Sequence, residues 1–110
     1  MKQSHTTVLE RNTEWKGKFE TEPCEAGWAS EAIFFVRVLE ANAEYIDADA
    51  QVQISPDGIH WANEWSTVLI DAEGGTTYCR VSHFGNWLRL TGELPEGISA
   101  KVLVYLVLKE

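Results

Sequence analysis

The chain has 110 residues, of which 45% are hydrophobic and 24% are charged, and this composition is typical of one globular domain with an apolar core. Nine Lys and Arg residues stand against seventeen Asp and Glu residues, and the net charge of −8 argues against nucleic acid as a partner. No apolar run reaches the ~20 residues of a membrane-spanning helix, and the N-terminus has no apolar signal-peptide core. We therefore expect a single β-sandwich domain over residues 1–110, with no membrane partner and a cytoplasmic location as synthesised.

The first half of the chain predicts edge strands and contains one ambiguous segment. Residues 6–10 and 14–20 are predicted as edge strands with charged outer faces. Residues 28–45 are rich in Glu and Ala, which favours a helix. The centre of this segment is dense in β-branched and aromatic residues, however, and it favours a strand over residues 31–41.

A hairpin with a defined turn is the strongest local signal in the sequence. Residues 50–54 alternate between apolar and polar side chains, so Val52 and Ile54 are predicted to point inward and the glutamines outward. In the turn that follows, Pro56 fixes φ at about −65° and Gly58 supplies a positive φ.

Asp57 and Trp61 complete this motif. Asp57 is predicted to accept backbone N–H groups within the turn. Trp61 begins the returning strand and is predicted to fold back over the hairpin. These structural roles explain the motif without any function.

The second half of the chain predicts further short strands. Turn signals at residues 71–75 and 94–97 separate strands at residues 78–82, 87–90 and 101–109. The last strand is apolar on both faces, which is typical of a central strand covered on both sides or of one whose second face packs against another subunit. The whole pattern predicts an all-β fold, a two-sheet antiparallel β-sandwich of jelly-roll type with about eight strands.

Candidates for catalysis or metal binding are few. Cys24 and Cys79 are too few for a disulfide framework, and free thiols are favoured over a single bridge. His5, His60 and His83 lack the spacing of a zinc motif, and no nucleophile elbow, Walker loop or dinucleotide fingerprint occurs. We therefore predict no catalytic residue, no metal site and no cofactor, and we predict that the protein is not an enzyme.

One combination of motifs resembles known families. The motif S-x-D-G-x-x-W at residues 55–61 is followed by an aromatic-x-Arg-hydrophobic strand at residues 87–90 and by a closing strand at residues 100–108. Over residues 32–108 this arrangement resembles discoidin-like jelly-roll domains, and it is also similar to small β-sandwich proteins of phage virions and related particles. The resemblance implies a jelly-roll sandwich with a structural role in a particle or a role in sugar or lipid binding.

Two functions stay open on the sequence alone. The first is a structural or assembly role as a subunit of a homo-oligomer or of a virion-like or shell-like particle, whose partner is a second copy or another particle protein. The alternative is a carbohydrate-binding module, in which aromatic platforms and polar side chains hold a glycan. The residues predicted for the carbohydrate site are Trp61, Trp65, Trp87, Asp57, Asn86 and Arg89, with Asn63 beside them.

Overall fold

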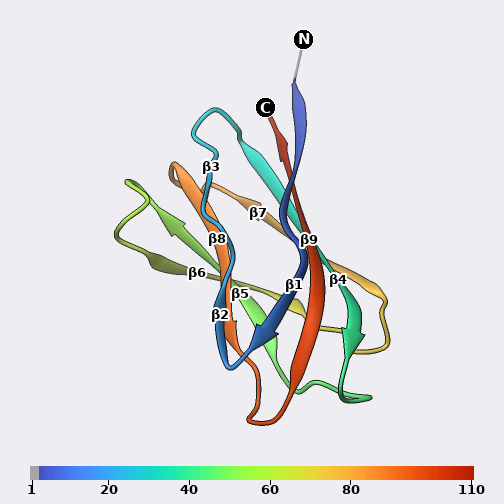
Figure 1. Cartoon of the computed structure of the whole chain (residues 1–110). Coiled ribbons are helices and arrows are strands. Elements are labelled where there is room, and N and C mark those ends of the chain that lie inside the picture. Colours follow the sequence, from blue (N-terminus) through green and yellow to red (C-terminus); the bar gives the residue numbers. More distant parts are fainter. Residues whose placement is uncertain (1–2) are drawn as a thin grey trace.

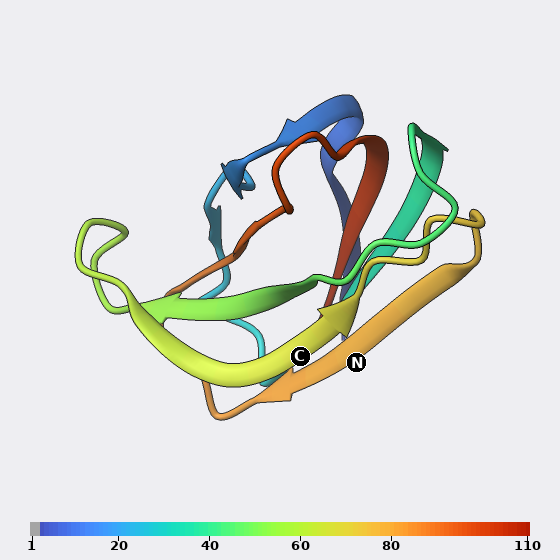
Figure 2. The same cartoon turned by 90° about the horizontal axis from the view of Figure 1, so that it is seen from below.

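The computed structural model describes residues 3–110, and within them the chain forms nine β-strands and no helix. The strands are β1 (Ser4–Lys16), β2 (Lys18–Glu20), β3 (Cys24–Glu25), β4 (Glu31–Ala41), β5 (Asp49–Ser55), β6 (Ala62–Leu69), β7 (Thr76–Ser82), β8 (Trp87–Glu93) and β9 (Ser99–Lys109). They pair in antiparallel fashion and build two sheets that pack face to face (Figure 1, Figure 2). This arrangement confirms the predicted all-β, two-sheet antiparallel sandwich.

The order of the strands is that of a jelly roll. Sheet A has the order β1-β9-β4-β7, and sheet B has the order β2-β8-β5-β6, with β3 also pairing with β8. Because β2 and β3 pair with successive stretches of β8, they fill one strand position, and the described chain occupies eight positions. The gap between them contains Pro23, which has no N–H to donate to a sheet ladder. The predicted jelly roll of about eight strands is confirmed.

Most sheet neighbours are far apart in the sequence. Among the described strands only β5 and β6 are neighbours both along the chain and within a sheet. In Figure 1, β1 begins and β9 ends at the same end of the sandwich, where the N–H of Glu110 donates to the carbonyl oxygen of Gln3 at 2.9 Å. Figure 2 shows β6 and β7 side by side along one flank, where sheet B meets sheet A. Side chains that share a face therefore come from distant parts of the chain.

The ambiguous segment at residues 28–45 contains β4, so the predicted strand over residues 31–41 is confirmed and the helical alternative is wrong. Burial alternates along β4, and Phe34 and Val36 are completely or almost completely buried. The strand pairs with β7 on one side and β9 on the other. These ladders and the packing of the inward side chains outweigh the local helical preference.

The N-terminal strands differ in extent from the prediction. β1 continues past residues 6–10 because two bulges, one of them with Asn12 at a φ of 54°, absorb the breaks in its alternation. The predicted strand at residues 14–20 is divided at Gly17, whose φ of 62° lets the chain leave sheet A and enter sheet B. β1 and β2 lie at sheet edges, as predicted.

The apolar core fills the space between the two sheets. Its largest fully buried side chains include Trp15, Phe34, Ile46, Ile70, Leu88, Leu90, Leu106 and Leu108. The Trp15 ring stacks on Phe19 with 3.9 Å between the ring centroids. Cys24 and Cys79 are free thiols, as the sequence favoured. Apolar packing therefore holds the sheets together without a covalent bridge.

β9 lies at the centre of sheet A, between β1 and β4. Its inward residues, from Ala100 to Leu108, are buried, whereas Leu103, Tyr105 and Val107 on the outer face are only half-buried. No strand of the described chain packs on that outer face. β9 is a central strand, as predicted. The prediction that other parts of the same chain cover both of its faces is wrong for the outer face.

Candidate functional site

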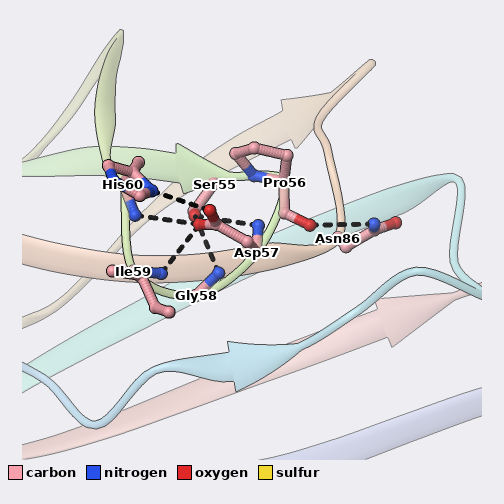
Figure 3. Close-up of polar contacts among 7 residues, drawn as sticks. All are labelled: Ser55, Pro56, Asp57, Gly58, Ile59, His60 and Asn86. Carbon is pink, nitrogen blue, oxygen red and sulfur yellow. Dashed lines mark hydrogen bonds and ion pairs between the residues drawn. The ribbon is translucent and has the colours of Figure 1, made fainter.

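Asp57 organises the turn between β5 and β6 (Figure 3). Its Oδ1 accepts hydrogen bonds at 2.9 Å from the backbone N–H groups of Ile59 and His60, and its Oδ2 lies 2.7 Å from Nδ1 of His60. Ser55 Oγ donates to Asp57 Oδ1 at 3.0 Å and accepts the N–H of Gly58 at 2.8 Å. The backbone N–H of His60, followed by its ring and the N–H of Ile59, holds the pKa of the Asp57 carboxyl well below its usual range. The predicted role of Asp57 and the positive φ of Gly58 are confirmed.

Asn86 and Trp87 fasten this turn to β8. Asn86 donates its backbone N–H to the carbonyl oxygen of Ser55 and its Nδ2 to that of Pro56, both at 3.1 Å. Figure 3 shows the second bond joining the turn to the segment before β8. The Trp87 ring packs so closely on Gly58 that a Cβ there would lie 3.1 Å from it. Asn86 and Trp87 lie beside the turn as the predicted carbohydrate site requires, but contacts within the chain already engage them.

Arg89 and Trp61 lie together on the outer face of sheet B. The Arg89 guanidinium is 4.2 Å from the centroid of the Trp61 ring. Arg89 Nε donates to Gln53 Oε1 at 2.8 Å, and Arg89 Nη1 donates to Glu20 Oε2 at 2.9 Å. Only 18% of the Arg89 side chain is exposed. Trp61 was predicted to fold back over the hairpin, but its ring packs on Arg89 of β8, and the ring against the turn is that of Trp87. Gln53 and Glu20 hold the guanidinium in place.

Trp65 occupies a strained and exposed position on the edge strand β6. Its bulge, residues 64–66, lies opposite Val52 alone, so β6 carries extra residues at this point. Trp65 has a φ of 82°, and 82% of its surface is exposed. A non-glycine residue at positive φ costs about 1–3 kcal/mol, and such outliers cluster at functional sites. Neither burial nor local backbone preference accounts for a tryptophan here.

A shallow polar cavity of about 530 Å³ lies on the outer face of sheet B. Amide and hydroxyl side chains of Gln51, Gln53, Asn63 and Thr91 line its floor, and Lys18, Asp47, Asp49 and Glu93 line one end. Asn63 belongs to the predicted carbohydrate site, whereas Gln51, Gln53 and Thr91 were not predicted there. Their outward direction follows from strand alternation, but only the order of the strands places them side by side.

The outer face of sheet A has a different character, because its centre is apolar and aromatic. The register places three rows of outward side chains across it: Thr6, Val107, Ile33 and Arg80; then Val8, Tyr105, Phe35 and Tyr78; then Arg11, Leu103, Arg37 and Thr76. In the middle row the ring centroids of Phe35 and Tyr78 are 6.1 Å apart. The Arg80 guanidinium lies 5.5 Å from the Tyr78 centroid, and Tyr78 is 54% exposed.

Charged residues close both ends of this apolar centre. At one end Lys109 on β9 lies in register with Glu31 on β4. At the other end Lys101 lies in register with Glu14 and Glu40, and its Nζ is 3.7 Å from Glu40 Oε2. Cations on β9 and carboxylates on its neighbours therefore lie at both ends of the apolar centre.

The remaining reactive groups form no constellation of their own. Burial, with a smaller effect of Glu64, raises the pKa of the Cys79 thiol to about 11, and burial also raises the pKa of Cys24. Among residues 3–110, no three His, Cys, Asp or Glu side chains gather so that they could hold a metal ion. The same stretch of chain contains no helix with the length and apolarity needed to span a membrane.

The chain was compared with models of known protein families, and none matches it. A comparison with curated proteins gives no match either. The jelly-roll fold by itself hosts unrelated functions. Function is therefore inferred from the residues on the two outer faces of the sandwich.

Proposed function

We propose that the protein is a non-enzymatic assembly protein, a jelly-roll subunit that self-associates through the outer face of sheet A into a homo-oligomer or a virion-like or shell-like particle. One observation carries the proposal, namely an apolar and aromatic sheet face that no strand of the described chain covers. Burial of apolar surface contributes roughly 25 cal/mol per Å². A contiguous patch of this kind is typical of an interaction surface.

The pattern of this face is complementary to a second copy of itself. A two-fold axis parallel to the strands, between β9 and β4, would place β9 of one copy over β4 of the other. Tyr105 then faces Phe35 of the second copy, and Val107 faces Ile33. The two-fold axis repeats each of these two contacts, so four contacts between apolar side chains form around it.

The charges on the face support the same axis. Lys109 of one copy would face Glu31 of the second copy, and Lys101 would face Glu40. On the outer strands, Arg80 of β7 would face Thr6 of β1 rather than another cation. In the third row, Arg37 would face Leu103 and Arg11 would face Thr76 of the second copy. The Lys–Glu pairs at the two ends join unlike charges, which favours this register over others.

The size of the face supports a stable contact. Four strands about 4.8 Å apart, and five rows of outward residues about 6.6 Å apart along the strands, give a face of roughly 20 by 30 Å. That projected area of roughly 600 Å² approaches the ~800 Å² that each partner buries in a typical specific interface.

Light scattering coupled to size-exclusion chromatography tests this proposal. The wild-type protein is expected at twice or a higher multiple of its chain mass of 12.4 kDa. Tyr105→Glu places a charge at the centre of the face and is expected to give monomers. Gln51→Glu is the matched control, because it adds the same charge on the outer face of sheet B. A folded wild-type protein that stays monomeric at high concentration would contradict the proposal.

Carbohydrate binding is a second candidate function, and the outer face of sheet B favours it. That face carries a polar cavity with amide side chains, and the exposed Trp65 lies on β6, the edge strand that also contributes Asn63 to the cavity. Because the two functions use opposite faces of the sandwich, a subunit can perform both.

A further inference from the structure

We infer that the polar cavity on sheet B is a groove for a neutral oligosaccharide, with Gln51, Gln53 and Asn63 on its floor and Trp65 as the aromatic platform at its edge. This inference rests on the second candidate function, carbohydrate binding, and is independent of self-association. It assigns the ligand class and the residues that hold the ligand.

The floor of the groove is ordered before any ligand arrives. Gln53 accepts a hydrogen bond from Arg89 Nε at 2.8 Å and donates its Nε2 to Asn63 Oδ1 at 3.0 Å. This chain of bonds fixes the orientation of both amides. Asn63 uses its Oδ1 in this bond, and within residues 3–110 its Nδ2 donates no hydrogen bond, so that group is available to a ligand. A site ordered in advance loses less side-chain entropy on binding.

Two contacts keep the arginine behind this floor in place. The Glu20 carboxylate accepts from Arg89 Nη1 at 2.9 Å, and the Trp61 ring lies 4.2 Å from the guanidinium carbon. Arg89 thereby connects three strands of sheet B, since Glu20 lies on β2 and Gln53 on β5. The arginine acts on the ligand through Gln53 and is a positioning residue.

Gln51 and Thr91 extend the row of polar groups along the groove. They are register partners on β5 and β8, and both line the cavity. Thr91 Oγ1 donates to the carbonyl oxygen of Phe19 at 3.1 Å, so its lone pairs remain to accept a hydrogen bond. The floor therefore offers both amide donors and oxygen acceptors, and sugar hydroxyls can both donate and accept there.

Trp65 supplies an exposed aromatic side chain on the same edge strand as Asn63. Its bulge follows directly on Asn63, which lines the cavity. The indole is exposed although its backbone is held at a strained φ of 82°. A large exposed ring can stack on the C–H face of a pyranose, and such amphipathic aromatics are common anchors at binding surfaces.

The charges around the groove select a neutral ligand. The lining residues include three carboxylates and one cation, namely Asp47, Asp49, Glu93 and Lys18. The negative potential disfavours phosphate, sulfate and uronate groups. The carboxylates gather at one end, whereas a basic peptide would need them along the whole floor. The neutral amides that occupy the floor suit hydroxyl groups.

Calorimetric titration of the intact chain with defined hexasaccharides tests the inference. The probes are cellohexaose, xylohexaose, mannohexaose and maltohexaose, with hexagalacturonate as the anionic comparison. We expect one or more neutral probes to bind at millimolar or lower concentration. Trp65→Ala is expected to weaken this binding at least about tenfold, and Asn63→Ala several-fold. Trp28→Ala, which removes another exposed indole away from the groove, is expected to leave binding unchanged.

The outcomes separate the inference from both candidate functions. Binding that survives Trp65→Ala and Asn63→Ala would overturn the groove but leave carbohydrate binding in place. If hexagalacturonate bound more tightly than every neutral probe, the ligand class would be wrong. Absence of binding by all probes would overturn both the groove and carbohydrate binding. Tyr105→Glu, on the opposite face, is expected to bind the glycan like the wild type.

Discussion

The outer faces of the two sheets are built by the same alternation but carry opposite chemistry. In sheet A the outward positions of β4 and β9 are aromatic and aliphatic, with Phe35 and Tyr105 side by side. In sheet B the outward positions of β5 and β8 include the amides of Gln51 and Gln53 and the hydroxyl of Thr91, and Arg89 donates a hydrogen bond to Gln53. The buried side chains between the two sheets are apolar except for Thr21 and Ser55. Both proposed functions therefore use the outward residues, whereas the buried residues hold the two sheets together.

The largest expected effect is a difference in stability between substitutions on the inner and the outer side of β4. Phe34 is fully buried, whereas its neighbour Phe35 lies on the outer face of sheet A. Phe34→Ala should lower the free energy of unfolding by about 3–5 kcal/mol. For Phe35→Ala we expect a loss of about 1 kcal/mol or less in the monomer, together with weaker self-association. Urea unfolding at low protein concentration measures both, and equal losses would contradict the assignment of the two sides.

A smaller effect tests how the β5–β6 turn is held against sheet B. Gly58 has a φ of 79° with the Trp87 ring close by, whereas Gly97 has a φ of 84° and open space around it. Gly97→Ala should cost about 1–2 kcal/mol through its backbone alone. Gly58→Ala should cost about 1 kcal/mol or more beyond that, because the ring must move. If thermal unfolding gave equal losses, the packing of Trp87 on the turn would be wrong.

An exchange of charges sharpens the account of sheet A. Glu31→Lys and Lys109→Glu each place like charges in register on one chain and across the proposed interface. Each variant should dimerise about five- to tenfold more weakly, as expected for roughly 1 kcal/mol. In an equimolar mixture the heterodimer pairs unlike charges across the interface, so association should recover. Native mass spectrometry measures this recovery, and a mixture that stays monomeric would argue against the proposed axis.

The smallest effect concerns Asp57 and pH. Its folded pKa is lowered from an unfolded value of about 3.9, so its carboxylate stabilises the fold above that pH. This contribution is lost as the pH falls from about 4 toward the lower folded pKa. The Asp57→Asn variant lacks this carboxylate and its contribution to stability. The difference in stability between wild type and variant should therefore shrink below about pH 4. Unfolding midpoints measured between pH 7 and pH 2 should show this, whereas a constant difference would contradict it.

The local features of this fold could be predicted from the sequence. The turn follows from the φ preferences of Pro56 and Gly58, and the alternation of β5 shows which residues point inward. The groove could not be predicted, because Glu20, Arg89 and Gln53 lie on three strands that only the jelly-roll order makes adjacent.

The same limit applies to the candidate functional residues. Trp61 and Arg89 do come together, but through a contact that their separation in the sequence does not reveal. The exposure of Trp65 depends on a bulge that interrupts the alternation of β6, and no residue type in that stretch marks the bulge. The apolar row of Val8, Tyr105, Phe35 and Tyr78 across sheet A could not be predicted either, because it depends on the register of four strands.

Disulfide trapping tests the proposed self-association through sheet A most directly. The two-fold axis places Val8 of one copy opposite Tyr78 of the other, while within one chain they lie three strands, or about 14 Å, apart. That separation is too large for a bridge within the chain. Val8→Cys with Tyr78→Cys, in a background of Cys24→Ser and Cys79→Ala, should give covalent dimers on mild oxidation, and neither single variant should. Monomers only, or an open ladder of larger species, would contradict the two-fold interface.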